Sequence, residues 1–190
     1  MSGIGGLLRT NLAPPRPDPP LSPGTPAGVL VPVIESSNGV TTLLLTVRSN
    51  EVRDHKGEIS FPGGVRHAED PDLLATAVRE TEEELGIREE SFEVLGALPP
   101  VDTVVTGYVI VPFVALVYGR PMITPSPVEI SEVLELEIVA LAAVEEEVTL
   151  EGDRAWFAYT LDGHTVWGAT GRIVHAFLET LRGAGWQGGR

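Results

Sequence analysis

The 190-residue chain contains no cysteine, only two methionines, and few aromatic residues, which make up 6% of it. The lack of cysteine excludes disulfides, thiolate nucleophiles and metal sites that need sulfur ligands. Positive charge is also scarce, because 13 lysine and arginine residues stand against 27 aspartate and glutamate residues, giving a net charge of −14. This balance argues against a broad nucleic-acid-binding face and against a polybasic membrane anchor.

Long apolar runs and targeting signals are missing too. No apolar run reaches the roughly 18 residues that a membrane-spanning helix needs. The apolar patch at residues 4–8 is interrupted by glycine and follows no charged segment, so we predict no signal peptide. The last three residues, Gly188-Gly189-Arg190, match no common address signal. We therefore expect a cytoplasmic protein.

The distribution of proline divides the chain. Residues 1–28 hold seven of the 16 prolines, and proline favours extended, polyproline-like backbone. We predict a proline-rich N-terminal extension over residues 1–28, followed by one α/β domain over residues 29–187, a length that suits a single core. The strands predicted from apolar, β-branched runs are 29–34, 40–47, 108–118, 133–139 and a hairpin of 155–161 with 165–167. The predicted helices are 72–85, 170–181 and a shorter one within 139–147.

The helix at 72–85 carries the most acidic part of the chain. We expect Asp70 to cap it, Pro71 to occupy its first position and Gly86 to end it. On a helical wheel Glu80, Glu83 and Glu84 share an arc of about 100°. This arc borders an apolar stripe that consists of Leu74, Ala77, Val78, Thr81 and Leu85. A hard divalent cation would relieve the repulsion between these carboxylates, whereas an ordinary solvated acidic helix is the alternative.

A glycine-rich loop precedes this helix. Ser60-Phe61-Pro62-Gly63-Gly64 follows a strand-like stretch, and glycine allows a ligand to approach the backbone closely. Such a loop can supply a carbonyl to a metal site and leave room for phosphate. Five of the 13 positive residues also fall within 48–79. They are Arg48, Arg53, Lys56, Arg66 and Arg79.

The helix resembles the signature of the Nudix hydrolases, in which an arginine and three glutamates precede a glycine and an apolar residue. The matching residues are Arg79, Glu80, Glu83, Glu84, Gly86 and Ile87, with Thr81 at a position that is usually apolar. The first half of the signature departs from the family, because Asp70 stands where a glutamate is expected and eight residues rather than seven separate it from Arg79. We therefore do not assign that glutamate's role to Asp70.

A second motif resembles the coenzyme A pyrophosphatase branch of the same family. Its specified positions are all matched, namely Leu44-Leu45-Thr46, Arg48-Ser49, Arg53, Gly57 and Phe61-Pro62-Gly63-Gly64. The resemblance implies an α/β/α sandwich around a mixed β-sheet. It also implies hydrolysis of the pyrophosphate bond of coenzyme A, or of its acyl or oxidised forms, to 3′,5′-ADP and 4′-phosphopantetheine or its derivative. The cofactor would be Mg²⁺ or Mn²⁺.

The same resemblance suggests roles for single residues. Glu80, Glu84, Glu83 and Gly64 are the expected metal ligands, and Glu80, Glu83 and Arg79 the expected catalytic set. The general base is Glu80, Glu83 or a carboxylate from a distant loop, for which Glu129 is the best candidate. The alternative for Glu129 is that it is solvated beside a strand, as Glu132, Glu135 and Glu137 would be.

Substrate contacts are predicted at Arg48, Arg53, Lys56 and Phe61, although Phe61 could simply pack beneath the loop. The expected partner is one small molecule, with no nucleic acid and no membrane, and the resemblance allows a homodimer. Two alternatives stay open. One is a Nudix hydrolase acting on ADP-ribose or a dinucleotide, and the other is a Nudix-fold sensor that binds a nucleotide without hydrolysing it.

Overall fold

The computed structural model describes residues 3–16, 18, 22–49, 57–103, 106–149 and 155–188. The helices are α1 (Ile4–Asn11), α2 (Leu73–Leu85), α3 (Ile138–Ala143) and α4 (Gly168–Gly183), with a 3₁₀ turn at Glu89–Ser91. The first strands are β1 (Thr25–Glu35), β2 (Thr41–Arg48), β3 (Ile59–Ser60), β4 (Gly63–Val65), β5 (Phe92–Ala97) and β6 (Val101–Asp102). The later strands are β7 (Tyr108–Val117), β8 (Ile130–Glu137), β9 (Glu145–Thr149), β10 (Ala155–Leu161) and β11 (His164–Val166).

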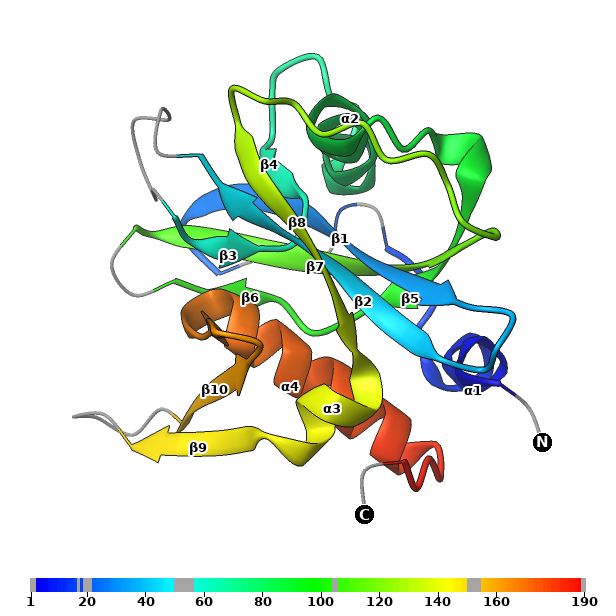
Figure 1. Ribbon diagram of the computed structural model, residues 1–190. Helices are drawn as coiled ribbons and strands as arrows, with labels where there is room; N and C mark the ends of the chain where they lie inside the picture. The colour runs from blue at the N-terminus through cyan, green and yellow to red at the C-terminus, as the bar shows by residue number, and fades with distance from the viewer. Residues whose placement is uncertain are drawn as a thin grey trace.

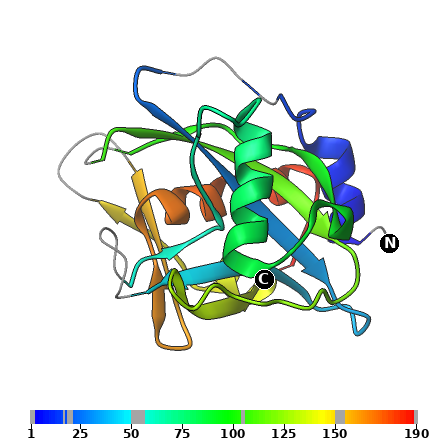
Figure 2. The ribbon, with the colours of Figure 1, turned by 90° about the horizontal axis from the view of Figure 1, so that it is seen from above.

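The main sheet is mixed. Its central path runs β3-β2-β1-β7-β5, while β8 pairs with β2, β4 with β1 and β6 with β7. β1 and β7 are parallel from Thr25 opposite Tyr108 to Ile34 opposite Val117, and the other pairs in this sheet are antiparallel. α2 covers one face of the sheet, and α4 lies on the other face with the small sheet β11-β10-β9 (Figures 1 and 2). The predicted α/β/α arrangement around a mixed sheet is confirmed.

β1 is buried on both faces, as expected of a strand between two helical layers. Val31 and Val33 belong to the apolar cluster on the α4 side, whereas Leu30 and Ile34 belong to the cluster beneath α2. Successive side chains of a strand point to opposite faces, so an apolar run of this kind fills two cores at once. Both the helix α2 and the loop before it are positioned against this strand.

The predicted strands at 40–47, 108–118 and 133–139 correspond closely to β2, β7 and β8, and the hairpin across Asp162-Gly163 is formed by β10 and β11. The short helix predicted within 139–147 ends earlier, at Ala143. The acidic segment after it forms β9, which pairs with β10. No helix in the described part of the chain is long and apolar enough to cross a membrane.

The N-terminal segment differs from the prediction in two ways. β1 begins at Thr25, so the predicted boundary at residue 28 falls inside a strand, because pairing with β7 extends to that residue. Residues 4–11 form α1 rather than extended backbone. Leu8 of this helix is fully buried in the core, and Gly5 N–H donates to Glu35 Oε1 at 2.8 Å. Tertiary packing of this kind outweighs the low helix propensity of a glycine pair.

Candidate active site

An aspartate begins α2 and a glycine ends it. The Asp72 carboxylate accepts a hydrogen bond from Ala75 N–H at 2.8 Å, and Gly86 ends the helix with a left-handed φ of 69°. The stop at Gly86 is therefore confirmed. The prediction that Asp70 caps the helix is wrong, because the side chain that reaches the free amides of the first turn belongs to Asp72.

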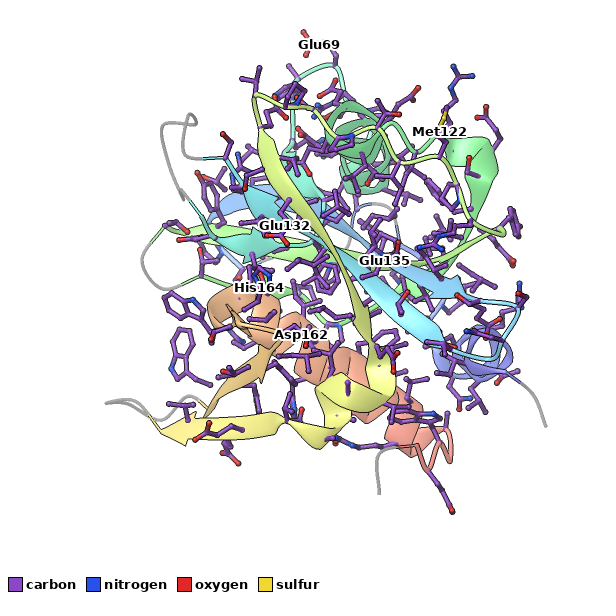
Figure 3. All side chains as sticks on the ribbon, viewed as in Figure 1. Glu69, Met122, Glu132, Glu135, Asp162 and His164 are labelled. Carbon is purple, nitrogen blue, oxygen red and sulfur yellow. The ribbon has the colours of Figure 1, made fainter. Side chains whose placement is uncertain are left out.

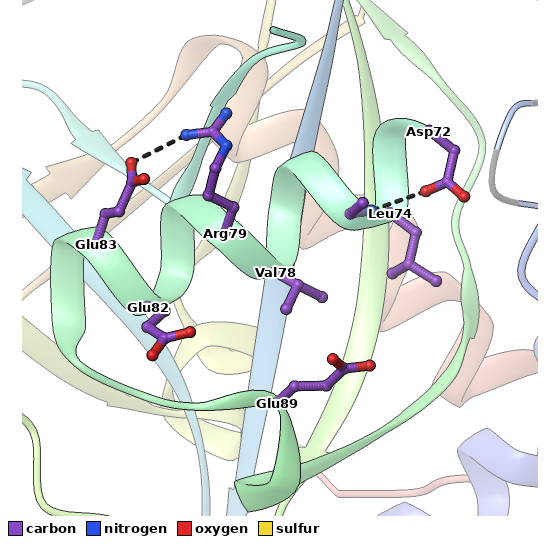
Figure 4. Close-up of a pocket in the computed structure, with 8 residues that line it drawn as sticks. Asp72, Leu74, Val78, Arg79, Glu82, Glu83 and Glu89 are labelled. Atoms are coloured by element: carbon purple, nitrogen blue, oxygen red, sulfur yellow. Dashed lines mark hydrogen bonds and ion pairs between the residues drawn. The ribbon is translucent and has the colours of Figure 1, made fainter. Parts of the chain in front are cut away.

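The buried face of α2 is rotated slightly from the predicted one. Its buried residues are Leu73, Thr76, Ala77, Thr81, Glu84 and Leu85. Leu74 and Val78 are only half-buried and line a hollow of about 680 Å³ on the outer side of the helix (Figure 4). Glu84 thus lies within the core-facing stripe rather than at its border, where the charge of a carboxylate is costly.

The glycines of the loop allow strand, loop and helix to approach closely. A Cβ atom on Gly64 would lie 2.6 Å from Glu80 Oε1, and one on Gly63, whose φ is +153°, would lie 2.4 Å from Gly28 O. Gly63 N–H donates to Glu84 Oε2 at 3.3 Å. Gly63 is therefore required where the loop lies against the backbone of β1, whereas Gly64 leaves the space that the Glu80 carboxylate occupies.

Glu84 is a buried carboxylate with few partners of its own. The residue is 3% exposed, and Arg48 Nη1 lies 3.7 Å from its Oε1 atom. The pKa of Glu84 is raised to about 8, mainly by burial, with Arg48 acting to lower it and the neighbouring charges of Glu80 and Glu129 acting to raise it. Nearby negative charge and desolvation both disfavour the ionised form, so this position calls for additional positive charge.

Arg79 joins three carboxylates on the outer side of this group. It pairs with Asp70 through Nε and Nη2, both at 3.0 Å, and its Nη1 lies 2.8 Å from Glu80 Oε1 and 2.9 Å from Glu83 Oε2. The Arg79 hydrogen bonds hold the pKa of Asp70 well below its usual range. The buried Asp70 also accepts from Thr76 Oγ1 at 2.9 Å. Asp70 is therefore an orienting partner of Arg79 rather than the predicted helix cap.

A pocket of about 470 Å³ brings several predicted residues together. Its lining includes Arg48, Phe61, Gly64, Glu80, Glu84 and Glu129. Glu83 does not line this pocket; its side chain is 56% exposed and is held by Arg79 on the outer side of α2 (Figure 4). Two further strand residues, Tyr108 and Ile110, also line the pocket, and neither was assigned a role from the sequence.

The predicted substrate contacts fall into different environments. Arg48 reaches the pocket, and its Nε atom is buried without a hydrogen-bond partner among the described residues. Phe61 is only 2% exposed and belongs to the apolar core, so its ring packs beneath the loop. Arg53 and Lys56 lie outside the described residues. Arg66, left without a role, pairs with Asp18 at 3.1 Å.

Glu129 is separated from the other acidic residues of its segment. It precedes β8, accepts a hydrogen bond from Ser49 N–H through its backbone carbonyl at 2.7 Å, and lines the pocket. Glu132 and Glu135 (Figure 3), like Glu137, are exposed residues of β8 that do not line this pocket. Position in the fold therefore distinguishes one member of an acidic run that looks uniform in the sequence.

The donor set has the chemistry that a hard cation prefers. Within the described ranges, no three His, Cys, Asp or Glu side chains already converge on one point. The groups that meet are the carboxylates of Glu80 and Glu84 and the backbone of Gly64. Oxygen donors of this kind suit Mg²⁺ or Mn²⁺, and the raised pKa of Glu84 marks a buried carboxylate that a cation would stabilise.

This geometry can be compared with known proteins. The NUDIX domain family matches residues 24–160, which is more than half of the chain. This chain belongs to the Nudix family. Nudix hydrolases cleave pyrophosphate bonds, generally with the help of a divalent metal such as Mg²⁺ or Mn²⁺.

Bacterial relatives support the same assignment. The uncharacterized Nudix hydrolase NudL of Pectobacterium atrosepticum is 35% identical over 158 residues, covering 78% of this chain and 79% of the relative. NudL of Citrobacter koseri is 37% identical over 154 residues and covers 78% of each chain.

Solved Nudix structures share the fold at low identity. The MutT protein from Methanosarcina mazei gives a TM-score of 0.55 at 17% identity, covering 87% of this chain and 98% of that one. The Ap4A hydrolase of Caenorhabditis elegans, in a binary complex, gives 0.52 at 20% identity over 60% of this chain and 80% of that one. The NUDIX domain of Shewanella oneidensis NrtR, solved with ADP-ribose, gives 0.50 at 20% identity, covering 62% and 75%.

Proposed function

We propose that this Nudix hydrolase cleaves the pyrophosphate bond of coenzyme A, or of its acyl or oxidised forms, in the cytoplasm. The products are 3′,5′-ADP and 4′-phosphopantetheine or its derivative. The observation that carries the proposal is the pocket itself. Arg48 and Gly64, from the segment that resembles the coenzyme A pyrophosphatase branch, share it with Glu80 and Glu84 of the Nudix helix.

Arg48 supplies the first contact with the substrate. Its guanidinium lies at the pocket, and its buried Nε–H has no acceptor among the described residues. Arginine binds phosphate through several N–H groups at once. Arg53 and Lys56, five and eight positions further along, are proposed contacts for the additional 3′-phosphate that distinguishes coenzyme A from other nucleoside diphosphates.

Glu80, Glu84 and the backbone of Gly64 would hold the Mg²⁺ or Mn²⁺, joined by Glu83 once its carboxylate leaves Arg79. A bound divalent cation neutralises charge on the pyrophosphate and lowers the pKa of a water molecule. Arg79 is a positioning residue in this scheme. It holds Glu80 and Glu83 on one side and is itself held by Asp70 on the other.

Glu129 is the proposed general base. It lines the same pocket as Glu80 and Glu84, where it can accept the proton of the attacking water. The water oxygen forms a bond to phosphorus while the bridging P–O bond breaks, and the bridging oxygen leaves with the other phosphate group. Glu80 and Glu83 are alternative bases, which a pH–rate profile of Glu129→Gln would separate from Glu129.

The direct test is to incubate the purified protein with coenzyme A and Mg²⁺ or Mn²⁺ and to separate the products. Release of 3′,5′-ADP supports the proposal. Glu83→Gln should abolish turnover with the fold retained, whereas Glu82→Gln, an exposed neighbour on the same helix, serves as the matched control. An unchanged rate for Glu83→Gln would remove Glu83 from the mechanism.

The same assay separates the other candidates. Hydrolysis of ADP-ribose or a dinucleotide but not of coenzyme A would assign the protein to another Nudix branch. The Ap4A hydrolase and the NrtR domain solved with ADP-ribose, both structural neighbours of this chain, make these substrates worth testing. Tight nucleotide binding without hydrolysis across a broad substrate panel would instead indicate a sensor.

A further inference from the structure

A second cavity, of about 320 Å³, opens beside the active-site pocket. The two cavities adjoin each other, because five residues line both. These shared residues are Glu58, Thr103, Thr106, Ala169 and Thr170. A substrate whose pyrophosphate lies against Glu80 and Glu84 can therefore extend one of its ends into this second space.

Two tryptophans form the distinctive part of the second cavity. Trp156 comes from β10, and Trp167 stands immediately before α4. Trp167 is 61% exposed, which is unusual for so large an apolar side chain. The Trp167 indole is therefore available to a ligand, and Trp156, which is partly exposed, lines the same cavity.

The register of the small sheet explains why both rings avoid the core. Tyr159, which is fully buried, pairs with Val166, which is 1% exposed, so these two residues face the core. Trp156 is three positions before Tyr159, and Trp167 directly follows Val166. Because side chains alternate along a strand, both tryptophans belong to the opposite face, on the side of the cavity.

Several polar groups around the cavity are already bonded to the protein. Thr103 Oγ1 lies 2.7 Å from Thr106 Oγ1 and also accepts from Tyr108 N–H at 2.7 Å, while Arg172 donates to the Asp102 carbonyl at 2.9 Å. A flexible arm that contains amides would need new hydrogen-bond partners inside such a space. A flat heterocycle does not, because its faces stack on indole rings and its polar edge can stay in water.

We infer that the Trp156–Trp167 cavity binds the purine base of the nucleoside diphosphate substrate by stacking. This inference rests on the proposed function for the position of the pyrophosphate, but the base-binding property can be measured without any hydrolysis. It makes Trp156 and Trp167 specificity-determining residues for substrates that carry an aromatic base.

The test uses the tryptophans as their own probe. In a Trp186→Phe protein, whose missing indole belongs to the α1 side of the molecule, only Trp156 and Trp167 fluoresce. Titration with AMP in the presence of a chelator should quench this fluorescence, whereas ribose 5-phosphate, which lacks the purine, and pantetheine should not. Adding Trp167→Ala should weaken AMP binding about tenfold, within the range known for base–aromatic stacking, and Trp167→Phe should restore most of it.

Absence of quenching by AMP, or AMP binding that is unaffected by Trp167→Ala, would overturn the inference. Quenching by pantetheine alone would also overturn it and assign the cavity to the arm of the substrate. The outcome is independent of the proposed function. If AMP binds there but coenzyme A is not hydrolysed, the proposed substrate fails and the base site stands. If Trp167→Ala hydrolyses coenzyme A with an unchanged KM, the base site fails and the proposed function stands.

Discussion

Two largely buried glutamates in this protein have opposite surroundings. Glu145, at the start of β9, accepts hydrogen bonds from Tyr159 Oη at 2.7 Å and His175 Nδ1 at 3.0 Å, and Arg182 lies 2.7 Å from its other oxygen. Glu84, in α2, has one backbone N–H at 3.3 Å and one guanidinium at 3.7 Å.

The pKa values of the two carboxyls move in opposite directions for this reason. Burial acts to raise the pKa of Glu145, but the hydrogen bonds from Tyr159, His175 and Arg182 together lower it. For Glu84 burial dominates and the pKa rises to about 8. The fold therefore satisfies one buried carboxylate with its own donors and leaves the other short of positive charge. The carboxylate that lacks positive charge, Glu84, is the one that lines the pocket.

The largest effect should come from Glu84→Gln. Loss of a proposed metal ligand should lower kcat by at least about 10²-fold, because a bound cation contributes several kcal/mol of charge stabilisation. Thermal unfolding should show equal or higher stability, because a buried carboxyl whose pKa is raised destabilises the folded state at neutral pH. Product release from coenzyme A and a melting curve measure the two effects. A strong loss of stability with full activity would instead show that Glu84 has a structural role and no part in catalysis.

Glu145→Gln should behave in the opposite way. The variant weakens charge-assisted hydrogen bonds in a partly buried network, so the free energy of unfolding should fall by about 2 kcal/mol. Turnover by the folded enzyme should change less than twofold, since Glu145 does not line the pocket. Urea unfolding and steady-state kinetics check this expectation, and a tenfold change in kcat would contradict it.

A smaller effect on kcat is expected at the start of α2, where Asp70 and Asp72 allow two neighbouring substitutions to be compared. Asp70→Asn weakens the paired hydrogen bonds that hold Arg79, which in turn holds Glu80 and Glu83. It should lower kcat about tenfold, as loss of a residue that orients a ligand does. Asp72→Ala removes the N-cap and should cost about 1 kcal/mol of stability with kcat unchanged. If both variants lost the same activity, Asp70 would have no role beyond the helix start.

The smallest effect is expected in how the free energy of unfolding changes at acidic pH. Because its folded pKa is depressed, Glu145 contributes stability that is present above the ordinary carboxyl pKa of 4.5 and is lost as pH falls through the lower folded value. The wild-type free energy of unfolding should therefore fall more steeply than that of Glu145→Gln when pH is lowered from 6 to 4. Parallel curves for the two proteins would show that the network does not favour the ionised form.

The sequence predicts the parts of this molecule that depend on local patterns. The β-branched runs of β2 and β7 and the Gly86 stop of α2 follow from residues close in the chain, and the structure confirms them. α1 was missed because its helical state depends on burial of Leu8 rather than on propensity. The strands β5 and β6 were missed because they are defined by pairing with β7, and β6 has only two residues.

The site follows the same division. Helical spacing was enough to associate Glu80 and Glu84, but it could not show that Glu84 is buried while Glu83 is held outside by Arg79. Asp70 and Arg79 are only nine residues apart, but the loop before α2 and not the helical period brings them together. Trp156 and Trp167 lie on either side of the β10–β11 hairpin, and their place around one cavity follows from how that hairpin packs in the fold. Spacing alone shows neither arrangement.

The contact between Gly64 and Glu80 bears on how mutational scans of this protein should be interpreted. Gly64 has no functional group, yet a single methyl group there would occupy space within 2.6 Å of a carboxylate oxygen of Glu80. A library scored for activity should therefore rank Gly64→Ala among the damaging changes, while a library scored for abundance should tolerate it better. Disagreement between the two scores would locate the site from a residue that performs no chemistry.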